Sequence, residues 1–244
     1  MQLETSPFKH VVIDGFFPKA LADKLADTFP AADSDWYKYD NVFEKKRAID
    51  KRDKMPTVHA GVLAELNTHT FINDIQKAFE IPHLISDHTF RGGGLHQIVP
   101  GGKLDVHVDF NIHPDSGLDR RINAILYLNP NWESSWGGNL ELWDKDMSAC
   151  VKSIAPAHNR MVIFETTDFS FHGHPDPLKC PKFRTRNSMA WYFYSNGRPE
   201  HERNPKHSTM FQKRPQDETT NEIEEFRKKR SRGAKHDVQH SASE

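Results

Sequence analysis

The chain has 244 residues, in which 33 Lys and Arg nearly balance 34 Asp and Glu, and 36% of its residues are hydrophobic. The near-zero net charge provides no bulk attraction to nucleic acid or to a membrane surface, and no apolar run is long enough to span a bilayer. The beginning of the sequence lacks the basic and apolar regions of a secretory signal. With only two cysteines, Cys150 and Cys180, the composition favours a reduced, cytoplasmic protein without a membrane partner.

Residues 1–91 are expected to form a mixed helical and strand region that supports the rest of the same domain. A strand is expected over 10–17. Leu21, Leu25 and Phe29 follow at helical spacing, so a helix is predicted over 20–29. A second helical stretch is expected over 60–80, where apolar stripes recur. These helices are expected to brace a sheet.

From 92 to 195 the apolar pattern changes to a period of two residues. Strands are predicted at 95–99, 104–109, 122–128, 139–143, 151–154, 161–164 and 185–194, with breaks rich in Gly, Pro and Asn between them. Many short strands separated by turns indicate a sandwich or a jelly roll. The fold class is therefore mainly β, with helices added at the N-terminal side.

Residues 196–244 have a different composition, rich in charged and poor in large apolar side chains. Such a segment buries too little surface to offset its ordering entropy, so a polar and partly disordered tail is expected. A short, exposed helix is predicted around 220–230, with Thr219 and Glu222 in a capping-box pattern. The basic run 227–232 suggests a nucleic-acid contact, but a solvated end is the favoured interpretation.

His107 and Asp109 are the residues that point most directly to chemistry. On a strand, residues i and i+2 face the same side, so an imidazole and a carboxylate would lie side by side. A second imidazole from a distant strand would complete the two-His, one-carboxylate set of non-haem Fe(II) oxygenases. His172 is favoured as this third ligand over the neighbouring His174. The alternative for His107 and Asp109 is a hydrogen-bonded surface pair on an edge strand.

Arg186 lies on a predicted strand whose alternation points it into the barrel. A buried guanidinium without a partner is costly, and a carboxylate ligand would supply that partner through two parallel hydrogen bonds. Tyr127, near the end of another strand, is placed to give the same carboxylate one more hydrogen bond. Arg120 and Arg121 precede this strand and are interpreted as a surface pair rather than as rim residues for an anionic substrate.

Residues 92–194 resemble the Fe(II)/2-oxoglutarate-dependent dioxygenases, in particular the prolyl 4-hydroxylase-like branch. The matching pieces are His107-Val108-Asp109-Phe110-Asn111, Ile125-Leu126-Tyr127-Leu128-Asn129, Trp136-Gly137-Gly138-Asn139-Leu140-Glu141-Leu142-Trp143, Phe171-His172-Gly173 and Thr185-Arg186-Asn187-Ser188. The resemblance implies a double-stranded β-helix core with His107, Asp109 and His172 as iron ligands. It also implies that Arg186 binds the distal carboxylate of 2-oxoglutarate, with Tyr127 as a second contact.

The function that this resemblance implies is hydroxylation of a C–H bond with release of succinate and CO2. The cofactors would be Fe(II), 2-oxoglutarate and O2, with ascorbate as a reductant. The expected target is a prolyl residue of a peptide or protein, or a proline-like small molecule; the oligomeric state is left open. Two alternatives remain: a metal-binding cupin-type enzyme without 2-oxoglutarate, and a non-catalytic jelly-roll binding protein. Succinate release coupled to oxygen uptake separates the first interpretation from the cupin-type enzyme, and the binding protein predicts no iron binding at all.

Overall fold

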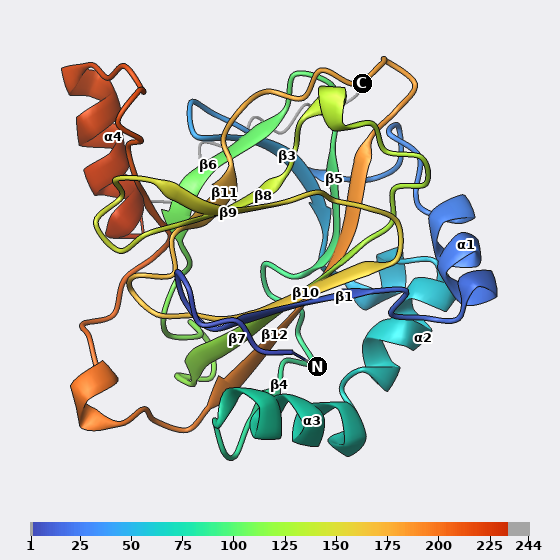
Figure 1. The fold of residues 1–244 in the computed structure, drawn as a ribbon, viewed down its shortest axis with the longest axis horizontal. Helices are drawn as coiled ribbons and strands as arrows, with labels where there is room; N and C mark the ends of the chain where they lie inside the picture. The colour runs from blue at the N-terminus through green and yellow to red at the C-terminus, as the bar shows by residue number, and fades with distance from the viewer. Residues whose placement is uncertain (1, 234–244) are drawn as a thin grey trace.

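The computed structural model describes residues 2–233, and within this part of the chain thirteen strands join in one sheet. The sheet curls into a half-barrel, with three helices packed outside one layer and a fourth helix beside the opposite layer (Figure 1). The first strands are β1 (His10–Asp14), β2 (Tyr37–Asp40), β3 (Glu44–Ile49), β4 (Ile85–Ser86), β5 (Gly94–Ile98), β6 (Lys103–Val108) and β7 (Asp119–Tyr127). They are followed by β8 (Leu140–Trp143), β9 (Cys150–Ile154), β10 (Arg160–Glu165), β11 (His172–His174), β12 (Arg186–Ser195) and β13 (Met210–Phe211). The helices are α1 (Lys19–Asp27), α2 (Thr57–Glu65), α3 (His69–Phe79) and α4 (Asn221–Ser231).

The order of the strands follows the jelly-roll pattern and confirms the predicted fold class. Neighbours along the sheet are β1-β10-β7-β12-β5-β3-β6-β11-β8-β9, and every pairing is antiparallel. One layer contains β1, β10, β7 and β12, and the other contains β6, β11, β8 and β9 (Figure 1). Because sequence neighbours are rarely sheet neighbours, residues far apart in the chain meet between the two layers.

Alternation along β7 separates the core from the cavity between the layers. Ile122, Ala124 and Leu126 belong to the largest apolar cluster, which α1, α2 and α3 cover from outside. The intervening side chains, Asn123 and Tyr127 among them, line the cavity instead. The period of two therefore lets one strand serve both the core and the site.

The helical stretch expected over 60–80 is two helices. α2 begins after Pro56, whose fixed backbone angle suits the start of a helix, and ends at Glu65. Thr68 adopts an extended conformation and precedes α3. A single continuous helix would have a single apolar face along its whole length. The break between α2 and α3 lets each helix turn its own apolar face toward the sheet.

The hairpin of β2 and β3 is absent from the sequence prediction. Its second strand reads Glu-Lys-Lys-Arg-Ala-Ile from Glu44, which does not alternate between apolar and polar residues. β3 nevertheless pairs with both β5 and β6, because it bridges the two strands at the edge of the cavity. Its long charged side chains reach the cavity and the solvent rather than a core.

The segment expected to be a polar, exposed tail is packed against the sheet up to residue 233. β13 pairs with β6, and Phe226 of α4 stacks on Phe43. Arg230 is buried and forms an ion pair with Glu44, at 2.9 Å. The helix cap is Thr220, whose side chain accepts from the backbone N–H of Ile223, one residue later than the expected cap. Partial disorder was expected over 196–244, and residues 234–244 of this range lie outside the described residues. The division of the chain at 92 and 196 stays a prediction.

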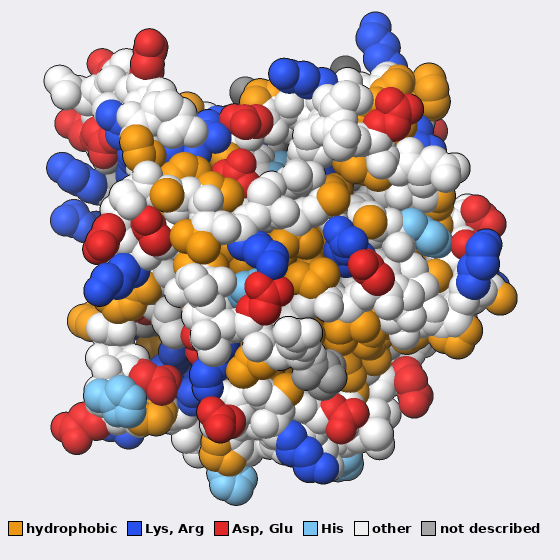
Figure 2. Space-filling view, viewed as in Figure 1, with side chains coloured by type: hydrophobic (Ala, Val, Ile, Leu, Met, Phe, Trp, Pro, Cys, Tyr) orange, Lys and Arg blue, Asp and Glu red, His pale blue; other side chains and the backbone are white. Residues whose placement is uncertain are grey.

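None of the helices between residues 2 and 233 is long and apolar enough to cross a membrane. Cys150 and Cys180 are both free thiols, the first exposed and the second buried. On the face that Figure 2 shows, Lys and Arg side chains are interspersed with Asp and Glu, in keeping with the balanced composition.

Candidate metal and co-substrate site

His107 and His172 face each other because their strands are direct neighbours. The antiparallel register of β6 and β11 places these two residues opposite one another, and their ring centroids are 4.4 Å apart. The close approach of the strands depends on Gly173, where an added Cβ would lie 2.8 Å from the backbone oxygen of Leu104. Asp109 follows β6 by one residue and projects to the same side as His107.

The ligand atoms of His107, Asp109 and His172 all lie within 4.8 Å of one another. The Nε2 atoms of His107 and His172 are 3.6 and 3.5 Å from the two carboxylate oxygens of Asp109. The Nδ1 atom of each imidazole is 2.8 Å from a backbone carbonyl oxygen, that of Asp105 or Ser170. With the proton held on Nδ1, each Nε2 lone pair is free for a metal.

This donor set therefore fits a divalent metal ion that prefers imidazole and carboxylate ligands and keeps open positions. Burial and the neighbouring His107 lower the pKa of His172 to about 4, so its ring is neutral at physiological pH, as a metal ligand requires. The three residues predicted from sequence are brought together. His174, the competing choice, is not among them.

Asp109 is oriented by two neighbours that the sequence did not identify. Asn123 donates to Oδ2 of Asp109 at 2.7 Å, and the guanidinium of Arg120 lies 3.1 Å from the same oxygen. Burial alone would raise the pKa of Asp109, but Arg120 and the two imidazoles hold it well below its ordinary value. The expectation of a surface pair was wrong for both arginines, since Arg120 and Arg121 are buried.

Arg186 is 4% exposed, and among residues 2–233 no carboxylate lies within ion-pair distance of it. Its Nε donates to the backbone oxygen of Gly138 at 2.7 Å, and another guanidinium nitrogen donates to the Tyr127 hydroxyl at 3.3 Å. Gly138 has a left-handed backbone, and a Cβ there would lie 3.0 Å from Arg186 Cδ. The sequence prediction that Arg186 points into the barrel beside Tyr127 agrees with these contacts, and an anionic ligand would supply the missing counter-ion.

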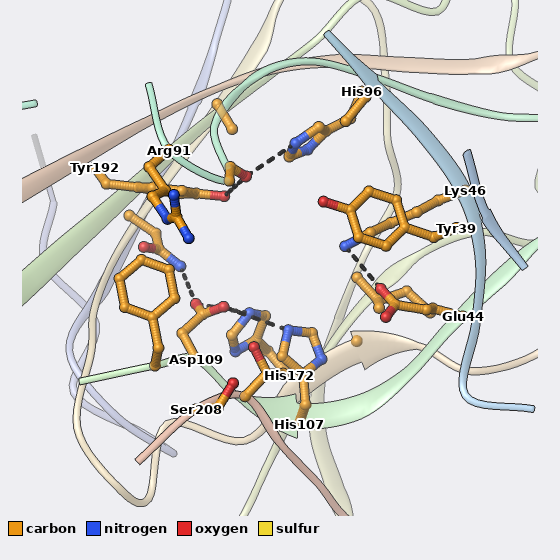
Figure 3. Close-up of a pocket in the computed structure, with 18 of the residues that line it drawn as sticks. Tyr39, Glu44, Lys46, Arg91, His96, His107, Asp109, His172, Tyr192 and Ser208 are labelled. Atoms are coloured by element: carbon orange, nitrogen blue, oxygen red, sulfur yellow. Dashed lines mark hydrogen bonds and ion pairs between the residues drawn. The ribbon is translucent and has the colours of Figure 1, made fainter. Parts of the chain in front are cut away.

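A cavity of about 990 Å³ connects the cluster of three ligands with Arg186. In Figure 3, Asp109, His107 and His172 lie on one side of it, His96 and Tyr192 border it, and Tyr39 and Lys46 lie across from Asp109. Residues 206–209 and 230–233 also line the cavity. The β2–β3 hairpin and two short segments near the end of the described chain, 206–209 and 230–233, thus form part of its wall.

Residues 93–208 match the model of the 2OG-Fe(II) oxygenase superfamily, and this part of the chain belongs to that superfamily. Its members use Fe(II), 2-oxoglutarate and O2. A mouse protein named prolyl 3-hydroxylase OGFOD1 is 38% identical over 86 residues, which are 34% of this chain and 15% of that protein. Its counterpart from Xenopus laevis is 37% identical over 91 residues, 36% of this chain and 18% of that protein.

The solved structures that resemble this fold include a Pseudomonas putida prolyl-4-hydroxylase. It has a TM-score of 0.58 and 18% identity, and the match covers 77% of this chain and 93% of that one. A Trichoplax adhaerens prolyl hydroxylase, solved with a peptide fragment of hypoxia inducible factor, has a TM-score of 0.55 and 14% identity, with 76% and 83% of the two chains covered. These neighbours establish the prolyl 4-hydroxylase-like jelly roll. The aligned region spans less than a fifth of the length of the curated relatives.

Proposed function

We propose that the protein is an Fe(II)- and 2-oxoglutarate-dependent hydroxylase whose target is a prolyl residue in a polypeptide, with succinate and CO2 as co-products. The observation that carries the proposal is the pairing of two features within one cavity. His107, Asp109 and His172 converge there, and Arg186 lies there as a buried cation without a carboxylate partner among the described residues. A metal-binding protein without an acidic co-substrate would not need a buried arginine such as Arg186 in its cavity.

Each side chain has a defined task in this proposal. His107, Asp109 and His172 hold the metal, and Arg186 with Tyr127 anchors the distal carboxylate of 2-oxoglutarate. When bound, Fe(II) and 2-oxoglutarate activate O2, so that one oxygen atom enters the substrate C–H bond and the other enters succinate. Phe164 packs edge-on against the His172 ring at 4.7 Å and Phe211 contacts the His107 ring at 5.5 Å. These apolar neighbours exclude water from the outer sides of both ligands.

The substrate class is supported by the relatives and by the size of the cavity. The curated relatives and the neighbours with a TM-score above 0.5 include prolyl hydroxylases, and one of them was solved with a peptide. A cavity of about 990 Å³ exceeds the needs of 2-oxoglutarate and leaves room for a segment of polypeptide. The two free cysteines support a cytoplasmic location as part of the same proposal.

The test is turnover of 2-oxoglutarate with Fe(II) and ascorbate, measured as succinate formed against a set of proline-containing peptides. A matched set carries alanine in place of proline. We expect turnover to rise only with the proline peptides, and mass spectrometry to show a gain of one oxygen on proline. Nuclear magnetic resonance of the product then identifies whether the hydroxyl is on C3 or C4.

Two variants assign the roles within the site. His107→Ala should abolish turnover and weaken Mn(II) binding, because a facial set with two ligands holds the metal poorly. Arg186→Ala should raise the Kd for 2-oxoglutarate at least tenfold, since a buried charge-assisted contact is lost, while the Kd for Mn(II) changes little. Loss of Mn(II) binding in Arg186→Ala with unchanged 2-oxoglutarate binding would contradict the assignment.

A further inference from the structure

His174 is a buried imidazole whose role the three metal ligands and Arg186 do not explain. It is 4% exposed, and neither of its ring nitrogens has a hydrogen-bond partner among residues 2–233. A buried polar group without a partner destabilises a fold, so such groups are rare and need an explanation. The ring is not a metal ligand in this arrangement, because it lies outside the cluster of His107, Asp109 and His172.

The position of His174 is fixed by the same strand that carries His172. The two residues are separated by Gly173 on β11, both pair across to β6, and both line the cavity. A register shift lies between the two pairs, so that His174 is opposite Leu104 rather than Asp105. The imidazole therefore lies farther from Asp109 along the same wall of the cavity.

Cationic side chains share the cavity with His174. Arg186 and Lys46 both line it, and Arg186 is buried without a carboxylate partner among the described residues. A neutral imidazole has one N–H to donate. A buried N–H donor that shares its cavity with such an arginine suits an anionic oxygen bound in the same space.

We propose that His174 donates a hydrogen bond to the distal carboxylate of 2-oxoglutarate, next to the contacts from Arg186 and Tyr127. This inference rests on the proposed function, because it assumes that 2-oxoglutarate is the co-substrate. It assigns a role to a histidine that would otherwise be buried without compensation. It also predicts that the protein is less stable without co-substrate, because the His174 ring is then buried without a hydrogen-bond partner. Bound 2-oxoglutarate would supply that partner.

The experiment measures binding rather than turnover, with Mn(II) in place of Fe(II). The variants are His174→Leu, of similar volume but without a donor, and His174→Asn, which restores a short N–H donor. His201→Ala is the control, since this histidine is highly exposed and is not among the residues that line the cavity. The ligands are 2-oxoglutarate and pyruvate, a 2-oxo acid that lacks the distal carboxylate.

For His174→Leu we expect the Kd of 2-oxoglutarate to rise about tenfold or more, as the loss of one hydrogen bond to a charged group implies. The Kd of pyruvate and the Kd of Mn(II) should change less than about twofold. This change is well below the change in Kd that the loss of a hydrogen bond would cause. His174→Asn should recover part of the affinity. Without ligand, His174→Leu should have a Tm equal to or above that of the wild type, because an unsatisfied group has been removed.

Unchanged 2-oxoglutarate affinity in His174→Leu would overturn the inference, and so would an equal loss of 2-oxoglutarate and pyruvate affinity. A Tm well below that of the wild type in the absence of ligand would show that the ring is structural, which also overturns it. Failure of the wild type to bind 2-oxoglutarate with Mn(II) is a separate result. It would refute the proposed function itself, whatever the variants do.

Discussion

The guanidinium of Arg120 lies between two aromatic rings, with its central carbon 3.5 Å from the ring centroid of Tyr192 and 4.6 Å from that of Phe110. Its Nε donates to the side-chain oxygen of Asn123 at 2.9 Å, and Asn123 in turn donates to Asp109. Oδ2 of Asp109 thus accepts a hydrogen bond from Asn123 and forms an ion pair with Arg120. The other oxygen, Oδ1, remains available to a metal, so Arg120 acts as a positioning residue.

Replacement of Arg120 by Met should weaken metal binding without touching a ligand. Partners that orient a ligand from outside typically contribute 10–100-fold to metal affinity, and we expect a loss of about this size in the Kd for Mn(II). Titration calorimetry or the relaxation of water protons by Mn(II) measures the change.

Arg121→Met is the matched control for this prediction. Arg121 is the next residue and is also buried, but its guanidinium contacts Ser195 and Glu202 rather than Asp109. Both variants remove one buried arginine from β7. An equal loss of Mn(II) affinity in the two would mean that Arg120 acts through general stability and not through Asp109.

At the scale of elements, three aromatic rings connect the C-terminal helix to the metal site. Phe226 of α4 stacks on Phe43 at 5.4 Å, Phe43 stacks on Phe211 at 4.8 Å, and Phe211 contacts the His107 ring. α4 has mostly charged residues and little apolar surface of its own. Its attachment therefore depends on Phe226 and on the buried Arg230–Glu44 pair.

Phe226→Ala should loosen α4 while the jelly roll stays folded. An aromatic pair contributes about 0.5–1.5 kcal/mol beyond the burial of its area, a large share of the stability of a short peripheral helix. Hydrogen exchange of the α4 amides should become several-fold faster, as a loss of about 1 kcal/mol implies. Lys229→Ala, an exposed change on the same helix, should leave the exchange rates as they are, and a similar acceleration in both would count against the role of the aromatic stack.

The elements differ in how far the sequence predicts them. β5, β6, β7, β10 and β12 alternate or are continuously apolar, so the sequence located each within a few residues. Glu44–Ile49 and Met210–Phe211 do not, because their pairing partners are strands distant in the chain and their side chains face the cavity or its rim. Arg120 was wrongly predicted to lie at the surface for a related reason. Its partner Asp109 comes close to it only when β7 is paired within the folded sheet.

The site itself was more predictable than its surroundings. The spacing of His107 and Asp109 and the alternation around Arg186 depend on strand geometry alone, which is local. The convergence of His172 depended on resemblance, since no local rule pairs β6 with β11. The empty hydrogen-bond positions of His174 are visible only in three dimensions.

At the scale of the whole molecule, two histidines outside the set of metal ligands, the buried His59 and the half-buried His207, respond to pH in opposite directions. His59 is fully buried, and its Nε2–H donates to the backbone oxygen of Leu25 at 2.9 Å; burial lowers its pKa. His207 is also affected by burial, but its contacts with Asp168 and the Ser208 carbonyl outweigh that effect and raise its pKa.

The sign of each contribution follows from proton linkage. His59 binds its proton less well when folded, so its contribution to stability is lost as pH falls below about 6.5, its unfolded pKa. His207 binds its proton better when folded, so its contribution is present below the unfolded pKa and is lost as pH rises through the folded pKa. Each contributes at most about 1.4 kcal/mol per pH unit.

Urea unfolding of the metal-free protein between pH 5 and 7 tests both contributions as differences from the wild type. His59→Gln should flatten the loss of stability on the acid side, and His207→Gln should steepen it. Parallel pH curves for the wild type and both variants would show that neither side chain has a shifted pKa.

The β2–β3 hairpin precedes the region that matches the superfamily, and β13 and α4 follow it. The three candidate metal ligands and Arg186 therefore lie in one stretch of the chain, and residues within 37–51 and 230–233, which also line the cavity, lie outside that stretch. A chimera that exchanges only these flanking segments with those of another oxygenase would keep the metal site and change the cavity wall. It would be the natural starting point for directing the proposed activity to a new target.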